Sequence, residues 1–196
     1  MEPSRVHRPY TKPKSTTKMP RCMNVTPFVQ SNLGKGRHAT ANLLQSELDI
    51  AIISEPYTID GMVGSNGNFT CYQKKTTDRV KACIFLKNDI NAQLLAGSDS
   101  NNVFVEVELG HFKVVVASLY YEPDGDIDDQ LRPLYKFHND NMDKLLLAGG
   151  DLNGHSSSWG SNETCARGEA IDLAMAGLGV YVLNTGKTPT FERVCK

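Results

Sequence analysis

Four short apolar runs along the chain each end in polar residues. The runs are rich in Val, Ile and Leu and cover residues 27–32, 49–55, 113–120 and 144–153. A strand with one face in water would alternate apolar and polar positions, whereas a near-continuous apolar run is typical of a strand buried on both faces. The pattern therefore predicts strands inside sheets that are covered on both sides.

Other segments repeat their apolar residues every three to four positions, as on one face of a helix. The predicted helices cover residues 36–48, 127–142 and 167–178. Four further strands, separated by turns rich in Asn, Gly, Asp and Ser, are predicted over residues 69–74, 80–86, 92–96 and 103–109. A meander of strands flanked by strand–helix–strand units predicts an α/β sandwich built from two sheets.

Composition places the chain among ordinary globular proteins. Its 196 residues fit one domain with a tail, and 40% hydrophobic and 22% charged residues are close to the globular average. No apolar run reaches the roughly 18 residues of a membrane span, and the first twenty residues lack the apolar segment of a secretory signal. The five cysteines form no C-x-x-C pair, which argues against a disulfide framework or a structural zinc site and favours a reducing compartment.

The charge is distributed unevenly along the chain. Residues 1–22 contain six of the 21 Lys and Arg residues but only one of the 22 Asp and Glu residues. This segment is also rich in Pro, Ser and Thr, so we expect a basic, disordered tail preceding a domain over residues 23–196. Such a tail can contact nucleic acid, act in nuclear import or have no role. The acidic domain suits a site that gathers carboxylates, for example around a divalent metal ion.

Polar side chains stand at the ends of the four buried strands. The candidates are Gln30, Asn32, Glu55, Tyr120, Asp151 and Asn153. Side chains two positions apart on a strand face the same side. This applies to Gln30 with Asn32 and to Asp151 with Asn153. Ligands of α/β sheets bind beyond the carboxyl ends of strands, and carboxylates and amides suit Mg²⁺ and a phosphate. Each residue alone is also an ordinary turn, cap or packing residue, so the prediction rests on all four strand ends meeting.

Several motifs of the chain resemble one enzyme superfamily. Residues 145–161 read LLLAGGDLNGHSSSWGS, Arg-Gly follows, and GLGVYVLNTGKTPTF completes the pattern, with QSN, SEPY and SLYYEP in the expected order before it. The chain is similar, over roughly residues 25–191, to the endonuclease/exonuclease/phosphatase superfamily, and most to the endonuclease domain of non-LTR retrotransposons. The resemblance implies a deoxyribonuclease I-like, four-layer α/β sandwich in which two mixed sheets are flanked by helices.

The resemblance also implies a role for each candidate residue. Glu55 would hold the divalent metal, Mg²⁺ or alternatively Mn²⁺, with Asn32 beside it. Asp151 would deprotonate the attacking water, Asn153 would position the scissile phosphate, and Tyr120 would donate a hydrogen bond to a phosphate oxygen. Gln30, His155 and Trp159 would contact the substrate, although local packing explains His155 and Trp159 equally well. The implied reaction is hydrolysis of a DNA phosphodiester that leaves a 3′-hydroxyl to prime reverse transcription.

The chain departs from the family pattern after the Pro-Thr-Phe element. The pattern continues with a Ser-x-x-Asp strand and a Ser-Asp-His element, whereas five residues follow Phe191 here and no Ser-Asp-His occurs. The missing His would bind the phosphate, and groups of this kind contribute about 10²–10⁴-fold to rate. We therefore expect a chain that is incomplete at its C-terminus, lacks the last strands of its sheets, and nicks DNA weakly.

Two alternatives to the DNA endonuclease remain open from the sequence. One is a non-catalytic nucleic-acid-binding remnant that uses the basic tail, and the other is a phosphodiesterase of the same superfamily acting on a small or lipid phosphate. For the leading interpretation we expect a monomer that acts on double-stranded DNA without a membrane partner. A reverse transcriptase domain would accompany it in full-length relatives. A DNA substrate would place the protein in the nucleus, and otherwise we expect a cytoplasmic protein.

Overall fold

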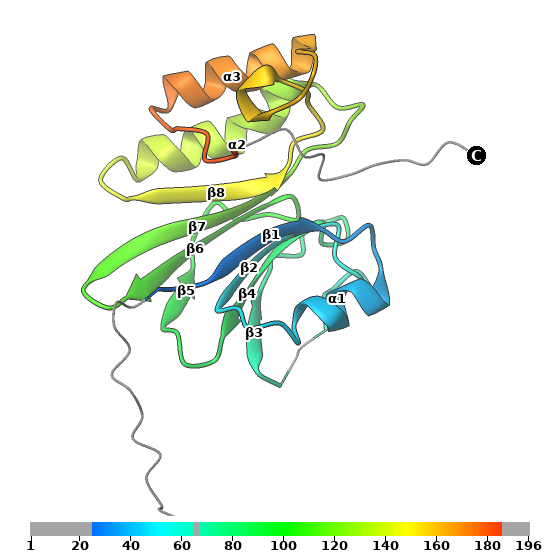
Figure 1. Ribbon diagram of the computed structural model, residues 1–196, viewed down its shortest axis with the longest axis vertical. Helices are drawn as coiled ribbons and strands as arrows, with labels where there is room; N and C mark the ends of the chain where they lie inside the picture. Colours follow the sequence, from blue (N-terminus) through cyan, green and yellow to red (C-terminus); the bar gives the residue numbers. More distant parts are fainter. Residues whose placement is uncertain (1–24, 65–66, 186–196) are drawn as a thin grey trace, which may run out of the picture.

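The structure is a computed structural model that describes residues 25–64 and 67–185. The predicted tail over residues 1–22 and the Pro-Thr-Phe element at 189–191 lie outside these ranges. Eight strands form two four-stranded sheets (Figure 1). The first sheet has the order β1 (Phe28–Asn32), β2 (Ile50–Ser54), β4 (Ala82–Lys87), β3 (Phe69–Tyr72). The second has the order β5 (Ala92–Leu94), β6 (Asn102–Leu109), β7 (Phe112–Tyr120), β8 (Leu146–Asp151).

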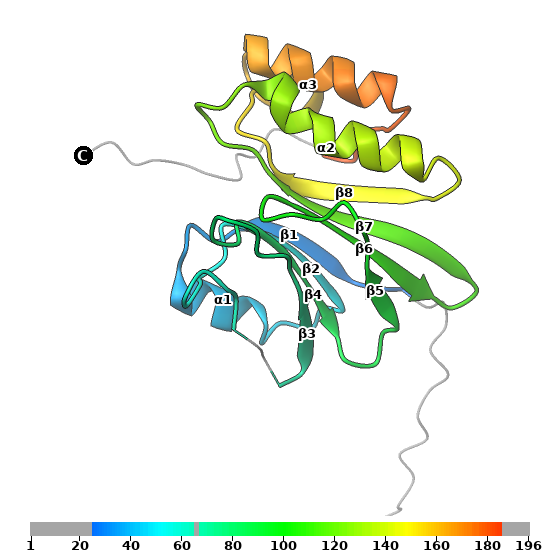
Figure 2. The ribbon, with the colours of Figure 1, turned by 180° about the vertical axis from the view of Figure 1, so that it is seen from behind.

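The sheets and helices stack as four layers, which confirms the predicted α/β sandwich. Helices α2 (Ile127–Asp140) and α3 (Ala166–Gly177) cover the outer face of the second sheet, and α1 (Arg37–Leu43) lies against the first (Figures 1 and 2). One apolar cluster, which includes Ile52, Ile84 and Val105, fills the space between the sheets. Each outer face has its own cluster, and the stacked rings of Phe104 and Phe137 join α2 to the second sheet.

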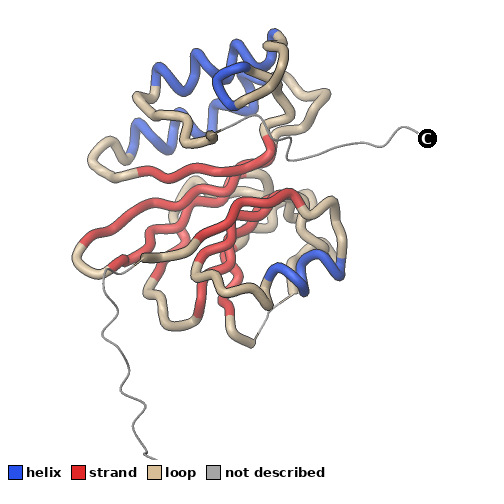
Figure 3. The backbone as a smooth tube through the Cα atoms, viewed as in Figure 1, coloured by secondary structure: helices blue, strands red, loops and turns tan. Residues whose placement is uncertain are grey.

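The predicted elements are present, but several of their ends were placed wrongly. The first helix ends at Leu43 instead of residue 48, because the chain turns over residues 44–48 to enter β2. The last buried strand ends at Asp151 instead of residue 153, and a short 3₁₀ helix, Ser157–Trp159, follows in the loop before α3 (Figure 3). No helix in residues 25–64 and 67–185 is long and apolar enough to cross a membrane.

Both sheets contain one parallel pair of neighbouring strands. β1 pairs in parallel with β2 in the first sheet, and β7 pairs in parallel with β8 in the second. The two pairs pack face to face, since β2 contacts β7 and β1 contacts β8 across the sandwich. All four carboxyl ends therefore meet at one rim. The predicted meeting of the four strand ends is confirmed, but the rim is shared between two sheets instead of lying along one.

Candidate active site

The shared rim holds two carboxylates that are joined by one amide. Asn32 ends β1, and its Nδ2 donates to Glu55 Oε2 at 3.1 Å and to Asp151 Oδ2 at 2.6 Å. The amide oxygen of Asn32 accepts from the Gly34 N–H at 2.8 Å. Residues that are 119 positions apart along the chain are thus in direct contact. We call Asn32, Glu55 and Asp151 the carboxylate cluster.

Glu55 follows β2 in a left-handed backbone conformation with φ of 47°. Lys35 Nζ lies 3.0 Å from Glu55 Oε1, and the Tyr120 hydroxyl lies 3.5 Å from the same oxygen. Partial burial raises the pKa of Glu55, but the hydrogen bonds from Lys35 and Asn32 lower it more, so the pKa falls below its ordinary value. Glu55 is therefore a carboxylate at neutral pH.

Two buried serines near the rim form hydrogen bonds between the two sheets. Ser54 is fully buried, donates through Oγ to the Leu119 carbonyl at 3.1 Å and accepts from the Asp151 N–H at 3.1 Å. Ser118, also fully buried, donates to the Ile53 carbonyl at 2.9 Å. Ser54 lies directly before Glu55 in the chain, so the hydrogen bond from the Asp151 N–H to its hydroxyl fixes the position of Asp151 relative to Glu55.

Asn153 does not share a face with Asp151, so the prediction from strand alternation was wrong. The strand has ended at Asp151, and Asn153 adopts a left-handed conformation with φ of 48°. Its N–H donates to Asp151 Oδ1 at 3.1 Å, and its Nδ2 donates to the Tyr121 carbonyl at 2.8 Å. Asn153 thus holds the turn that carries Asp151 against the end of β7.

Tyr120 ends β7 and extends its hydroxyl to the carboxylate cluster. Burial, followed by the negative charges of Glu55, Glu122 and Asp151, raises the pKa of Tyr120 to about 12. The hydroxyl therefore keeps its proton at neutral pH and serves as a hydrogen-bond donor. Beside it, Lys81 and Glu122 form an ion pair, and the Lys81 carbonyl accepts from the Glu55 N–H at 2.8 Å.

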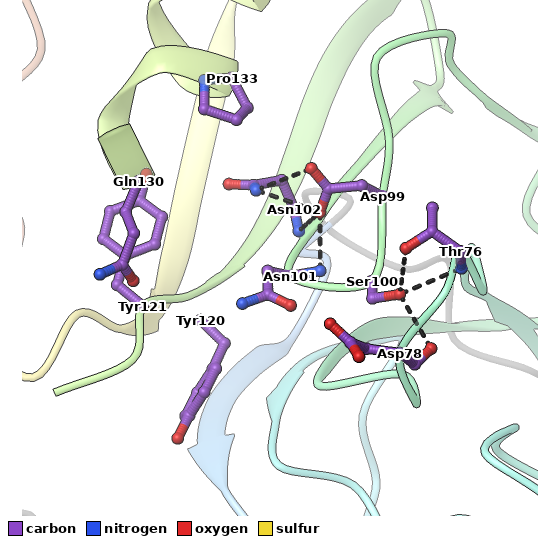
Figure 4. Close-up of a pocket in the computed structure, with 10 residues that line it drawn as sticks. All are labelled: Thr76, Asp78, Asp99, Ser100, Asn101, Asn102, Tyr120, Tyr121, Gln130 and Pro133. Carbon is purple, nitrogen blue, oxygen red and sulfur yellow. Dashed lines mark hydrogen bonds between the residues drawn. The ribbon is translucent and has the colours of Figure 1, made fainter. Parts of the chain in front are cut away.

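Tyr120 also lines a pocket of about 260 Å³ (Figure 4). Its lining comprises Thr76, Asp78, Asp99, Ser100, Asn101, Asn102, Tyr120, Tyr121, Gln130 and Pro133. Asp99 accepts from the backbone N–H groups of Asn101 and Asn102, both at 2.7 Å, and so shapes the loop before β6. Tyr120 thus contacts the carboxylate cluster and also lines this pocket.

The three predicted substrate residues lie outside the carboxylate cluster. Gln30 is exposed on β1 and packs over Gly149, where an added Cβ would lie 3.0 Å from Gln30 Cγ. His155 is exposed in the loop after β8. The Trp159 indole donates to the Gly154 carbonyl at 3.3 Å, a contact within its own loop.

Residue patterns alone did not reveal two parts of this site, Lys35 and Ser54, whereas Arg167 belongs to the Arg-Gly element of the resemblance. Lys35 stands in a Gly-Lys-Gly turn that looks like an ordinary turn in the sequence, and Ser54 looks like a routine strand residue. The Arg167 guanidinium donates to the carbonyls of Leu152, Gly125 and Glu122, which ties the loops after β7 and β8 to α3. The adjacency of Ser54 to Glu55 was the available signal for the serine, and only the three-dimensional fold reveals the position of Lys35.

The donor set of the cluster fits a hard divalent cation. Glu55 supplies carboxylate oxygens, and Mg²⁺ characteristically takes one or two carboxylates and completes its shell with water and substrate phosphate. Within residues 25–64 and 67–185, no three His, Cys, Asp or Glu side chains group as a complete metal cage.

Comparisons with known proteins place the chain in a family. A family profile described as "Endonuclease-reverse transcriptase" matches residues 114–195. The solved structure titled "Endonuclease domain of TRAS1, a telomere-specific non-LTR retrotransposon" is 30% identical, has a TM-score of 0.75, and is matched over 85% of this chain and 77% of its own. The chain therefore belongs to the family of endonuclease domains of non-LTR retrotransposons.

A curated relative agrees with this assignment. The RNA-directed DNA polymerase from the mobile element jockey of Drosophila funebris is 21% identical over 151 residues. The match covers 74% of this chain but only 16% of that polymerase. The chain thus corresponds to one part of a much longer, reverse-transcriptase-containing relative.

Proposed function

We propose that this domain nicks double-stranded DNA by metal-dependent hydrolysis of a phosphodiester. The observation that carries the proposal is the contact of Asn32 with both Glu55 and Asp151, which assembles two carboxylates where two parallel strand pairs end. A pair of carboxylates beside a protonated phenol suits attack on a phosphate better than passive binding. Membership in a family of endonuclease domains supports the same reaction.

Glu55, with Asn32 beside it, would hold the divalent cation, Mg²⁺ in preference and Mn²⁺ as a substitute. A bound cation neutralises charge on the phosphate and lowers the pKa of a coordinated water. Asn32 holds Glu55 and Asp151 side by side, and the low pKa of Glu55 keeps its charge available at neutral pH.

Asp151 would take a proton from the attacking water. The new bond forms between the water oxygen and phosphorus, and the bond to the 3′ oxygen breaks, leaving a 3′-hydroxyl after protonation from solvent. Asp151 is suited to this task because Ser54 and Asn153 fix its backbone N–H and one carboxylate oxygen. A positioned general base of this kind contributes about 10²–10⁴-fold to rate.

Tyr120 and Asn153 would position the phosphate from the other strand end. The raised pKa of Tyr120 keeps its hydroxyl protonated at neutral pH, so the hydroxyl can donate to a non-bridging phosphate oxygen. Asn153 contributes by holding the turn after Asp151 against Tyr121. We assign the exposed Gln30 and His155 and the half-buried Trp159 to the surrounding DNA surface, with Trp159 also supporting its own loop.

The biological setting follows from the proposed substrate. A nick that leaves a 3′-hydroxyl would supply the primer for a reverse transcriptase domain in longer relatives, such as the jockey polymerase that this chain matches in part. Such a reaction requires access to chromosomal DNA, so we propose a nuclear site of action for a monomeric domain.

Nicking of supercoiled plasmid in Mg²⁺ tests the proposal directly. We expect activity that a chelator abolishes and that Asp151→Asn lowers at least about 100-fold. Asp143→Asn is the matched control, because Asp143 is exposed in the turn before β8, at the far end of the strand from Asp151. Nicking that survives the chelator or Asp151→Asn would refute the proposed chemistry.

The two alternatives predict different results in the same preparation. A binding remnant would hold DNA in the Asp151→Asn variant, lose affinity steeply with salt, and lose binding when residues 1–22 are deleted. A small-phosphate phosphodiesterase would hydrolyse soluble or lipid phosphodiesters and leave plasmid intact.

A further inference from the structure

Lys35 provides the cation that pairs with the carboxylate cluster in this structure. Its Nζ lies 3.0 Å from Glu55 Oε1, and its side chain is 50% exposed whereas that of Glu55 is 19% exposed. Among the ion pairs of residues 25–64 and 67–185, only this one reaches Glu55 or Asp151. The ammonium therefore faces the carboxylate from the solvent side, from which an ion or a substrate would approach.

The backbone fixes Lys35 beside Glu55 at a second point. The Lys35 N–H donates to the Glu55 carbonyl at 2.8 Å, and the Gly36 N–H closes the turn on the Leu33 carbonyl at 2.8 Å. Lys35 itself has φ of 62°, a left-handed conformation that favours glycine over a residue with a long side chain. A lysine at such a position costs conformational energy, and residues held in such conformations cluster at functional sites.

We propose that Lys35 is a positioning residue that acts as an exchangeable counter-ion of Glu55. Its ammonium neutralises Glu55 in the metal-free protein, gives up Oε1 when a divalent cation binds, and then pairs with a phosphate oxygen of the DNA. This inference rests on the proposed metal-dependent nicking and adds a residue that links cation binding to DNA binding.

The exchange has a thermodynamic consequence. A divalent cation must break the pair between Lys35 and Glu55, so the ammonium weakens cation binding in the absence of DNA. With DNA bound, the freed ammonium gains a phosphate partner and the penalty is offset. Because such coupling is reciprocal, the cation and the DNA should strengthen each other's binding through Lys35.

Mn²⁺ binding to the full chain, measured by electron paramagnetic resonance without DNA, tests the exchange. We expect Lys35→Met to bind Mn²⁺ roughly tenfold more tightly than the unchanged protein, as removal of one nearby positive charge predicts. Lys35→Arg keeps the charge and should bind as the unchanged protein does. A merely structural role would not increase affinity, since loosening Glu55 can only weaken the site.

Lys87→Met is the matched control for surface charge. Lys87 Nζ pairs with Asp49 Oδ1 at 3.1 Å with 44% of its side chain exposed, and the pair lies where β2 begins, at the opposite end of the strand from Glu55. Its replacement should leave Mn²⁺ affinity unchanged. Equal affinities in Lys35→Met and Lys87→Met, or weaker binding in Lys35→Met, would overturn the proposal for Lys35 while leaving the proposed function intact.

DNA supplies the second readout. With a plasmid substrate, Lys35→Met should raise KM several-fold more than it lowers kcat, and added DNA should no longer tighten Mn²⁺ binding. A loss confined to kcat would contradict the transfer of the ammonium to phosphate. Absence of Mn²⁺ binding by the unchanged, folded chain would overturn both this inference and the proposed function.

Discussion

Tyr120 and Tyr121 are neighbours whose side chains enter very different surroundings. Tyr120 extends to the carboxylate cluster, where Asn32, Lys35 and Tyr120 itself supply donors to Glu55. Tyr121 is buried on the other side, in the pocket under α2 (Figure 4). Within the described part of the chain, its hydroxyl has no hydrogen-bond partner, and neither do the buried oxygens Asn102 Oδ1 and Gln130 Oε1 of the same pocket.

The difference shows that the polar groups of the cluster are paired by hydrogen bonds, whereas several of those in the pocket are not. The carboxylate cluster is charged, yet its groups are held by hydrogen bonds that cross between the two sheets. In the pocket, by contrast, the three buried oxygens named above are uncharged and have no hydrogen-bond partner among the described residues. Buried polar groups without partners each cost about 1–3 kcal/mol. We therefore expect substitutions behind the cluster to destabilise the fold, and removal of a polar group from the pocket to be tolerated.

The largest expected effect on stability comes from the glycine before Asp151. A Cβ on Gly150 would lie 2.0 Å from the Leu119 carbonyl oxygen on the neighbouring strand, so β7 and β8 would have to separate. Gly150→Ala should lower the free energy of unfolding by about 3 kcal/mol, measured by urea denaturation, and should displace Asp151. Gly177→Ala is the control, because nothing lies within 4 Å of its Cβ at the end of α3. Equal stabilities of these two variants would contradict the close approach of the strands.

The serine behind the cluster should have the next largest effect. Ser54→Ala removes a donor to Leu119 and an acceptor for the Asp151 N–H in a fully buried position. We expect a loss of about 2 kcal/mol of unfolding free energy. Ser118→Ala removes a single bond, to the Ile53 carbonyl, and should cost about half as much. If Ser118→Ala lowered the free energy of unfolding more than Ser54→Ala, Ser54 would not be the serine that stabilises the rim.

Tyr121→Phe tests the pocket side of the comparison. The hydroxyl has no partner among the described residues, so its removal should raise the free energy of unfolding by about 1 kcal/mol or leave it unchanged. Tyr72→Phe is the matched change, because the Tyr72 hydroxyl donates to the Ala92 carbonyl at 3.2 Å and its loss should destabilise. A clear destabilisation by Tyr121→Phe, seen in thermal unfolding, would reveal a partner for that hydroxyl, such as an ordered water.

Strand and helix positions could be predicted from the sequence because burial leaves periodic patterns. The run over residues 49–55 became β2, whose five residues are all buried. The ends of elements were harder, because they depend on where the chain turns. Residues 44–48 continue the helical apolar pattern, yet they leave the helix to enter β2 in parallel with β1.

The site could be predicted only in part for a similar reason. The strand-end residues Asn32, Glu55, Tyr120 and Asp151 were identified together, and the fold brings them together at one rim. Their arrangement across two sheets required tertiary contacts that no local pattern encodes. The sequence did not indicate Lys35, because its contact with Glu55 depends on the left-handed backbone conformations of both residues, which no local pattern predicts.

The smallest expected effect is the pH dependence contributed by Glu55. Its pKa is lower in the folded protein than its ordinary value of 4.5, so its charge stabilises the fold above that value and the contribution is lost as pH falls through the folded pKa. The difference in unfolding free energy between the unchanged protein and Glu55→Gln, measured in chelator between pH 7 and 3, should therefore shrink below about pH 4.5. Glu163→Gln, at an exposed position, should give a difference that changes less with pH. A difference for Glu55→Gln that grows as the solution becomes acidic would mean that Asp151 opposes the charge of Glu55 more than Lys35 and Asn32 favour it.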